Sequence, residues 1–309
     1  MRSNQVPYIV AAVCITLLAL SATLVSVLTT GAPRAPKAPM TPVTPIAAGS
    51  PTKAGFKSFR FVVYGDTRDG HEVHRKLVEL IMKQNPAFVL QTGDMVHSSK
   101  PSLWKIYDDI TGDMRKKIPL YPSRGNHDIG GDGYEAHVTE PFTSGNKLYY
   151  SFDKENAHII CLAIDEVTDY GTKSAQYKWL VEDLKAARDK GKVTFAFFHV
   201  PPYSIGSHGS DEKVREVLCP LFIQYGVTAV FNGHDHNYYR TERDGITYIV
   251  SGGGGAPLYP CNVSKGVIPG DKYQSVNHIL VCDVNGDSMT MTAIRADGST
   301  LDNFVLKAR

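Results

Sequence analysis

The sequence lacks a strong excess of either charge, and it lacks an internal repeat. Its 309 residues carry a formal net charge of +2, from 33 lysines and arginines against 31 acidic residues. The first 55 residues contain four basic side chains and no acidic one, so the remainder carries 2 − 4 = −2. This balance excludes the basic footprint of a nucleic-acid-binding surface. An apolar content of 42% is ordinary for a globular protein and excludes a disordered or fibrous chain.

Charge is also absent from one long segment near the N-terminus. No charged residue lies between Arg2 and Arg34, and residues 8–28 are mostly apolar, long enough for the roughly 20 residues that cross a bilayer. A clean signal-peptide cleavage site is missing after this run. We therefore expect residues 1–30 to be a membrane anchor or, as the alternative, a signal segment. The rest of the chain would then be exported to the periplasm or the cell exterior, and it would be secreted if the segment is cleaved.

Acidic residues and large apolar side chains are scarce in residues 31–55, where six prolines occur. This composition predicts a semi-extended, proline-rich linker that contributes no core. The folded domain is expected to cover residues 56–309.

The periodicity of this domain alternates between strand and helix. FRFVVYG (59–65) and AFVLQTG (87–93) are short apolar runs typical of strands, and residues 72–84 between them have helical spacing. This order predicts a βαβ unit with a parallel strand pair. Further strands are predicted at 118–121, 148–152, 158–163, 194–198, 228–231, 246–250, 279–284 and 289–294, and helices at 102–115, 173–189 and 212–224. We expect an α/β domain with two packed sheets covered by helices.

Polar residues follow the ends of five of the predicted strands. Strand ends in open α/β sheets form ligand crevices, so these side chains should converge on one place. Oxygen and imidazole ligands without thiolate are those that Mn²⁺, Fe or Zn²⁺ accept, and two carboxylates offset part of the charge. The sequence therefore predicts a two-metal site, with the candidates Asp66, Asp94, His97, Asn126, His127, Asp128, His199, His234 and His236.

These motifs, in this order, resemble the calcineurin-like metallophosphoesterase family. The resemblance runs from Phe59 to about Arg240 and rests on the motifs GDTR (65–68), TGDMVH (92–97), GNHD (125–128), FFHVPP (197–202) and NGHDH (232–236). It implies a four-layer αββα sandwich of two packed mixed β-sheets flanked by helices. Here that domain would be preceded by an N-terminal membrane-spanning helix.

The resemblance also implies how two divalent or trivalent ions, Mn, Fe or Zn, would be held. Asp94 would bridge them. The other ligands divide between the ions, with Asp66 and His236 on the first metal and Asn126, His199 and His234 on the second. Residues two apart in an extended loop point the same way, so the two histidines of the HDH motif can each face one of two ions roughly 3.5 to 4 Å apart.

His127 follows a ligand but does not bind metal in the family pattern. It would bind the phosphoryl oxygens together with Asn126, or protonate the leaving alkoxide. Asp128 would either orient His127 or cap the turn. The two ions would lower the pKa of a shared water and supply a bridging hydroxide for in-line attack.

One position departs from the common family motif. That motif begins Asp-x-His, and Arg68 replaces the histidine, although an arginine side chain does not ligate a metal. Purple acid phosphatases, a branch of the superfamily, also lack this histidine and carry a ligating tyrosine three residues after the bridging aspartate, where this chain has His97. We expect His97 either to complete the first metal's shell or to lie in solvent. Arg68 would bind a substrate phosphate or pair with Asp69 or another acid.

The sequence thus favours a metal-dependent phosphoesterase acting on phosphate mono- or diesters of small-molecule or macromolecular substrates. The alternative is a membrane-tethered, non-catalytic binding protein with a degenerate metal site, which the replacement at position 68 alone favours. Substrate selection would lie in three loops, 129–147, 201–211 and 252–276.

Overall fold

A computed structural model describes residues 57–131, 133–137 and 146–309. The predicted anchor, 1–30, and the predicted linker, 31–55, lie outside these residues. Within the described part of the chain, no helix combines the length and the apolar character that crossing a bilayer requires.

The described residues form two mixed β-sheets. The first has six strands in the order β13-β12-β11-β1-β2-β3, in which β1, β2 and β3 run parallel and the other three are antiparallel. The parallel strands are β1 (Phe59–Tyr64), β2 (Phe88–Gln91) and β3 (Leu120–Pro122). The antiparallel strands are β11 (His278–Asn285), β12 (Ser288–Arg295) and β13 (Thr300–Lys307).

The second sheet has seven strands in the described residues, in the order β10-β8-β9-β7-β6-β5-β4. Its central strands β5, β6, β7 and β9 are parallel, whereas β4, β8 and β10 pair antiparallel at the two sides. The strands are β4 (Tyr150–Lys154), β5 (Ala157–Cys161), β6 (Val193–Phe197), β7 (Ala229–Asn232), β8 (Tyr238–Arg243), β9 (Ile246–Ser251) and β10 (Lys272–Gln274).

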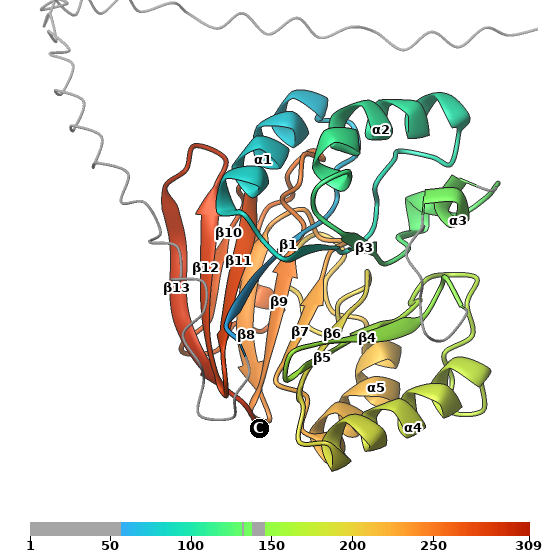
Figure 1. Cartoon of the computed structure of the whole chain (residues 1–309), viewed down its shortest axis with the longest axis vertical. Coiled ribbons are helices and arrows are strands. Elements are labelled where there is room, and N and C mark those ends of the chain that lie inside the picture. Colours follow the sequence, from blue (N-terminus) through green and yellow to red (C-terminus); the bar gives the residue numbers. More distant parts are fainter. Residues whose placement is uncertain (1–56, 132, 138–145) are drawn as a thin grey trace, which may run out of the picture. The chain divides into compact units, whose positions relative to one another are not determined.

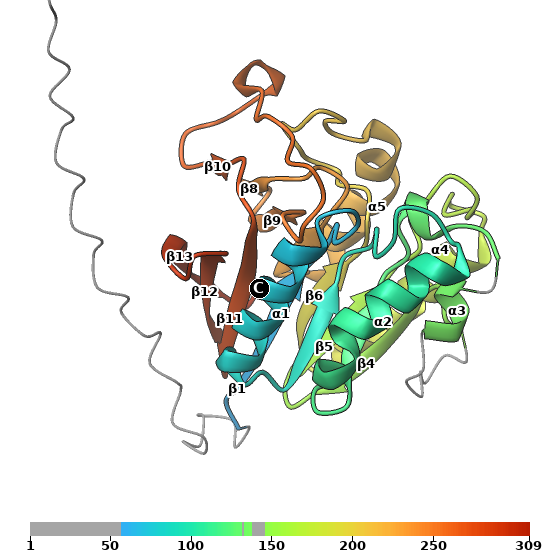
Figure 2. The same ribbon diagram turned by 90° about the horizontal axis from the view of Figure 1, so that it is seen from above.

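Helices cover the outer face of each sheet (Figures 1 and 2). The first sheet carries α1 (His71–Gln84) and α2 (Pro101–Arg115), and the second carries α4 (Ala175–Asp189) and α5 (Glu212–Tyr225). The buried residues of α1 recur at helical spacing, so a single apolar face packs on the sheet. The predicted α/β fold with two mixed sheets is confirmed.

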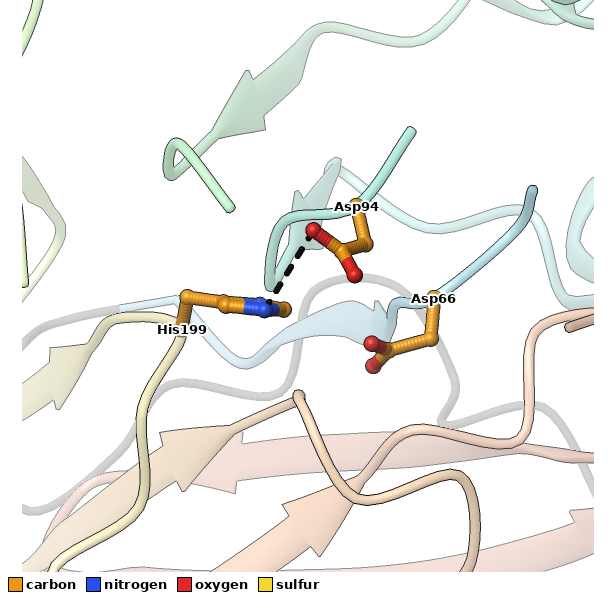
Figure 3. Close-up of side chains that lie close together, drawn as sticks. All are labelled: Asp66, Asp94 and His199. Carbon is orange, nitrogen blue, oxygen red and sulfur yellow. Dashed lines mark ion pairs between the residues drawn. The ribbon is translucent and has the colours of Figure 1, made fainter. Parts of the chain in front are cut away.

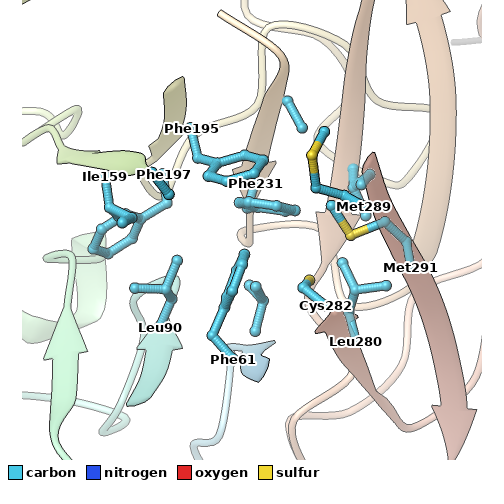
Figure 4. Packing of buried hydrophobic residues seen from close by; sticks show 14 of the residues in the cluster. Phe61, Leu90, Ile159, Phe195, Phe197, Phe231, Leu280, Cys282, Met289 and Met291 are labelled. Atoms are coloured by element: carbon cyan, nitrogen blue, oxygen red, sulfur yellow. The ribbon is translucent and has the colours of Figure 1, made fainter. Parts of the chain in front are cut away.

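The largest apolar cluster lies between the two sheets (Figure 4). Along β1, Phe61 and Val63 face this cluster, whereas Val62 and Tyr64 face the helices, as the two-residue period of a strand requires. The ring of Phe61 lies 6.0 Å from the ring of Phe231 on the other sheet, edge to face. Burial on both faces explains why β1 is apolar at nearly every position.

Four short or polar elements were not predicted from the sequence. These are α3 (Gly133–His137), β8, β10 and β13. The hairpin β8–β9 nevertheless has a local signal, because Asp244 and Gly245 link it with φ of 53° and 74°. An Asp-Gly pair with positive φ is a preferred two-residue hairpin turn.

Candidate metal centre

The loops after β1, β2, β3, β6 and β7 bring the predicted ligands together. These residues form a candidate metal centre. Asp66, Asp94 and His199 lie close together in it, each with one ligand atom within 4.8 Å of the others (Figure 3). All three are buried, at no more than 1% exposure. His199 Nε2 lies 3.4 Å from Asp94 Oδ1.

Three residues of this centre have unusual backbone conformations. Asp66, Asp94 and His234 adopt φ of 57°, 52° and 71°, in the left-handed region that residues other than glycine rarely occupy. Such conformations are costly and gather at functional sites, where surrounding contacts impose them. One contact that holds these conformations is a hydrogen bond from the backbone N–H of His234 to Asp66 Oδ1, at 3.0 Å.

One half of the centre consists of Asn126, His199 and His234. His234 Nδ1 lies 3.2 Å from both Asn126 Oδ1 and His199 Nε2, and those two atoms are 3.1 Å apart. His199 Nδ1 donates to the carbonyl of Thr92 at 2.8 Å, which leaves the lone pair of Nε2 facing the other two atoms. An amide oxygen and two imidazole nitrogens converging in this way suit a cation.

The other half consists of Asp66 and His236. His236 Nδ1 donates to the carbonyl of Pro257 at 2.7 Å, so the unprotonated Nε2 points towards Asp66 Oδ1, 3.6 Å away. The ring of Tyr259 stacks on the His236 ring at 4.0 Å and fixes its plane. Asp94 has one ligand atom within 4.8 Å of Asp66 and of His199, one residue from each half.

The protonation of these groups fits metal binding. Burial raises the pKa of Asp66 well above its ordinary value, and the nearby charge of Asp94 raises it further. Burial lowers the pKa of His234 to about 2 and that of His236 to about 4. Both imidazoles are therefore neutral near pH 7 and offer lone pairs, while a bound cation would stabilise the two buried carboxylates in their charged form.

His127 lies beside Asp94 but is held differently from the ligands. Its backbone N–H donates to Asp94 Oδ1 at 3.0 Å, and its ring Nδ1 contacts the carbonyl of His97 at 2.6 Å. This leaves Nε2 near the centre, 3.9 Å from Asp94 Oδ2. Asp128 accepts hydrogen bonds from the backbone N–H groups of Gly125 and Met95, both at 2.9 Å, and does not hydrogen-bond the His127 ring. Its contacts are those of a residue that caps the turn.

Arg68 and His97 are both tied to Asp69. Arg68 Nη1 donates to Asp69 Oδ2 at 2.8 Å, while its Nε lies 3.5 Å from Asp94 Oδ2. The Arg68 side chain is 11% exposed, and its Nε has no hydrogen-bond partner among the described residues. His97 Nδ1 lies 3.1 Å from Asp69 Oδ2, and 57% of its side chain is exposed. The structure thus brings Arg68, rather than the His97 ring, against the carboxylate shared by the two halves.

Asp235, between the two histidines of the HDH motif, neither faces solvent nor hydrogen-bonds either of their rings. Asp235 is fully buried and accepts hydrogen bonds from the backbone N–H groups of His208 and Gly209 at 2.9 and 3.0 Å, and from the Ser204 hydroxyl. These bonds pull the loop after β6 over the centre. The His208 ring consequently lies 4.0 Å from the His234 ring.

The glycine run 252–255 packs directly behind the centre. A Cβ added at Gly252 would lie 2.2 Å from the Asp235 carbonyl oxygen and 2.8 Å from Asp66 Oδ2. The N–H of Gly254 donates to the carbonyl of Gly65 at 2.8 Å. Close backbone approach, rather than a flexible turn, explains these glycines.

Comparison with known proteins agrees with this geometry. Residues 59–238 match the family described as calcineurin-like phosphoesterase. Purple acid phosphatase 15 of Arabidopsis thaliana is 30% identical over 52% of this chain and 34% of its own length. Tartrate-resistant acid phosphatase type 5 of Homo sapiens is 26% identical over 63% of this chain and 69% of its own length.

Solved structures share the fold. The purple acid phosphatase PPD1 from yellow lupin (Lupinus luteus) superposes with a TM-score of 0.72 at 18% identity, over 84% of this chain and 55% of that one. GAP50, described as the anchor in the inner membrane complex of Plasmodium, gives a TM-score of 0.63 at 18% identity, over 82% of this chain and 89% of that one. The family match covers more than half of the sequence and includes every predicted ligand. The chain therefore belongs to the calcineurin-like phosphoesterase family.

Proposed function

We propose that the protein is a metal-dependent phosphoesterase that hydrolyses phosphate mono- or diesters. The observation that carries this proposal is the buried convergence of Asp66, Asp94 and His199 from three separate loops. Its relatives are acid phosphatases, and the chain spans about one third of the length of one and two thirds of another.

The family implies a dinuclear metal centre, and the donor set fits one. Asp94 would lie between two ions of Mn, Fe or Zn. Asp66 and His236 would hold the first, and Asn126, His199 and His234 the second. When bound, the two ions neutralise phosphoryl oxygens and lower the pKa of a water molecule.

The remaining groups would orient the substrate and move protons. Because the carbonyl of His97 fixes Nδ1 of His127, the Nε2 atom faces the centre and can donate a proton to the leaving oxygen. Asp94 Oδ2, 3.9 Å away, would stabilise the protonated ring. Arg68 Nε makes no hydrogen bond within the described residues and lies 3.5 Å from Asp94 Oδ2, so the guanidinium is placed beside the centre and suits a phosphoryl oxygen. The amide nitrogen of Asn126 would bind a second such oxygen while its Oδ1 faces the metal.

The second candidate is a non-catalytic binding protein, and Arg68 is the observation that favours it. A guanidinium beside Asp94 supplies positive charge where a metal would otherwise do so. Against this, the six predicted ligands and His127 all remain at the centre. Catalysis accounts for the whole set, whereas a degenerate site has no need of His127.

The test is hydrolysis of a chromogenic phosphomonoester and a chromogenic diester after metal removal and stepwise return of Mn²⁺, Fe²⁺ or Zn²⁺. We expect turnover to disappear with the metals, to return with them, and to be lost in His234→Ala. A His71→Ala variant is the matched control, since His71 lies at the start of α1 outside the ligand set. Metal binding without hydrolysis of either ester would support the binding-protein alternative instead.

We also propose that residues 1–30 tether the exported domain to a membrane, with 31–55 as a spacer. The support is the uncharged apolar run of 8–28. Fractionation of the full chain tests it, with N-terminal sequencing of the mature protein. Recovery of an intact N-terminus in the soluble fraction would exclude the anchor.

A further inference from the structure

A polar groove lies beside the loop that carries His208. Its volume is about 600 Å³, within the range of small-molecule sites. Three cationic side chains line it, those of Arg215, Arg243 and Lys265, against one acidic side chain, that of Glu212. The lining therefore carries 3 − 1 = +2 before histidine is considered.

Arg215 is the cation with the fewest partners. Its guanidinium carbon lies 4.9 Å from the centre of the Tyr203 ring, a contact that orients the planar group. Its Nε is buried and has no hydrogen-bond partner among the described residues. The protein therefore leaves this guanidinium incompletely satisfied, and an anion in the groove would pair with its charge.

The other two cations differ in how much charge they leave free. Arg243 is compensated, since its Nη1 lies 3.7 Å from the buried carboxylate of Asp271 and its Nη2 donates to the carbonyl of Gly266. Lys265 Nζ donates to the carbonyls of Gly206 and Ser207, at 2.7 and 2.9 Å, and these are neutral acceptors. One ammonium proton and the full positive charge remain available. Arg215 and Lys265 together suit the oxygens of a phosphate or carboxylate.

One loop, residues 203–210, connects the groove with the metal centre. Asp235 holds it on the side of the centre through the N–H groups of His208 and Gly209. Lys265 holds its carbonyls on the side of the groove. His208 lines the groove, and its ring lies 4.0 Å from the ring of His234, so this side chain adjoins both the groove and the metal centre.

We propose that this groove binds a second anionic group, a phosphate or carboxylate, of the same substrate whose scissile phosphate lies at the metal centre. The inference rests on the proposed phosphoesterase function and narrows its substrates to phosphate esters that carry another acidic group. Arg215 and Lys265 are the specificity-determining residues.

The first test compares α,ω-alkanediol bisphosphates of increasing chain length with alkyl monophosphates of matched length, using the metal-loaded full chain. We expect one range of lengths to be preferred over the monophosphates through a lower KM. Arg215→Gln should reduce that preference about tenfold, as the loss of one charge-assisted contact predicts. Arg188→Gln is the matched control. Arg188 lies on α4, outside the lining of the groove, and like Arg215 it packs over a tyrosine ring, that of Tyr225 at 5.0 Å. A preference that is absent, or that Arg215→Gln leaves intact, overturns the proposal.

A second measurement does not depend on turnover. Binding of alkane bisphosphonates, alkylphosphonates and inorganic phosphate is followed by isothermal titration calorimetry. The proposal requires the bisphosphonate to bind more tightly than either of the others, and requires Arg215→Gln to remove the difference. If neither the bisphosphates nor the monophosphates are hydrolysed, the phosphoesterase function fails. The binding result still shows whether the groove holds a second anionic group. If inorganic phosphate alone binds as tightly as the bisphosphonate and loses affinity in Arg215→Gln, the groove serves a free anion and the proposal is wrong.

Discussion

The half of the centre that contains Asn126, His199 and His234 offers an amide oxygen and two imidazole nitrogens, and no arginine or lysine of the described residues pairs with these side chains. The half that contains Asp66 and His236 lies beside the guanidinium of Arg68. Burial lowers the pKa of His236, and the positive charge of Arg68 lowers it further. Burial raises the pKa of Asp66, and the charge of Arg68 opposes that rise. Two halves with similar numbers of ligands therefore need not bind metal equally well, because the positive charge of Arg68 beside one half would repel an ion bound there.

The largest effect is expected from breaking the half without the arginine. His199→Ala removes a fully buried proposed ligand whose Nε2 lies 3.4 Å from Asp94 Oδ1. We expect at least about a thousandfold loss of kcat/KM, which corresponds to about 4 kcal/mol of transition-state stabilisation. Steady-state kinetics with metal analysis measures this, and circular dichroism establishes that the variant folds. Near-normal activity with two ions bound would remove His199 from the ligand set.

The variant Asp235→Ala tests whether the loop held by Asp235 supports both halves of the centre. The carboxylate of Asp235 accepts hydrogen bonds from the Ser204 hydroxyl and from the backbone N–H of His208. Asp235→Ala leaves these donors unsatisfied, so we expect the free energy of unfolding to fall by about 2 kcal/mol. We also expect kcat/KM to fall about thirtyfold, about 2 kcal/mol in the barrier, because His208 loses its position over His234.

Denaturant unfolding and kinetics follow the two effects of Asp235→Ala. Asp113→Ala, an exposed carboxylate that pairs with Lys116, is the control. If the variant loses activity only by losing metal from one half, Asp235 acts as part of that half and not as a shared support.

The helices and strands that could be predicted are those whose burial leaves a pattern in the local sequence. β1 and β2 are buried on both faces, and α1 on one, so apolar runs and helical spacing identified them. β8 escaped prediction because its charged residues Arg240, Glu242 and Arg243 interrupt the apolar pattern, and its place is set by pairing with β9. Strand pairing of that kind depends on residues remote from the strand itself.

The ligands could be proposed from the sequence because each lies in a short motif at a strand end. The structure adds what depends on loops folding back across the molecule. Arg68 reaches Asp94 from a different loop, and the loop of residues 203–210 reaches Asp235 from a different strand end. The position of His208 over His234 follows from that contact, and no local spacing encodes it.

Arg68→Gln sharpens the comparison by removing the fixed charge while keeping most of the side-chain volume. The charge removed is the one that would repel a bound metal ion. Two unit charges of the same sign about 4 Å apart repel by about 4 kcal/mol at an effective dielectric constant of about 20. Solvent and ions screen part of this, so we expect the weaker of two metal affinities to rise about tenfold and the stronger to change little.

Competition between the protein and a chelator of known affinity measures the metal constants of Arg68→Gln and the wild type. Arg75→Gln serves as the control, because Arg75 is exposed on α1 and pairs with Glu72. Two equal affinities in the wild-type protein, unchanged by Arg68→Gln, would contradict the proposed asymmetry.

The smallest effect is expected at His97, the residue offered by the sequence as a substitute ligand in the half beside Arg68. Its ring contacts Asp69 and is 57% exposed, so removing it breaks a partly exposed side-chain pair and uncovers little apolar surface. Such pairs contribute about 0 to 1 kcal/mol. We therefore expect His97→Ala to keep two ions per chain and to change kcat/KM less than about threefold. Metal analysis after gel filtration decides the matter, with His236→Ala as the reference that loses the first ion. Loss of that ion in His97→Ala as well would make His97 a ligand and would show that its loop moves towards Asp66 when metal binds.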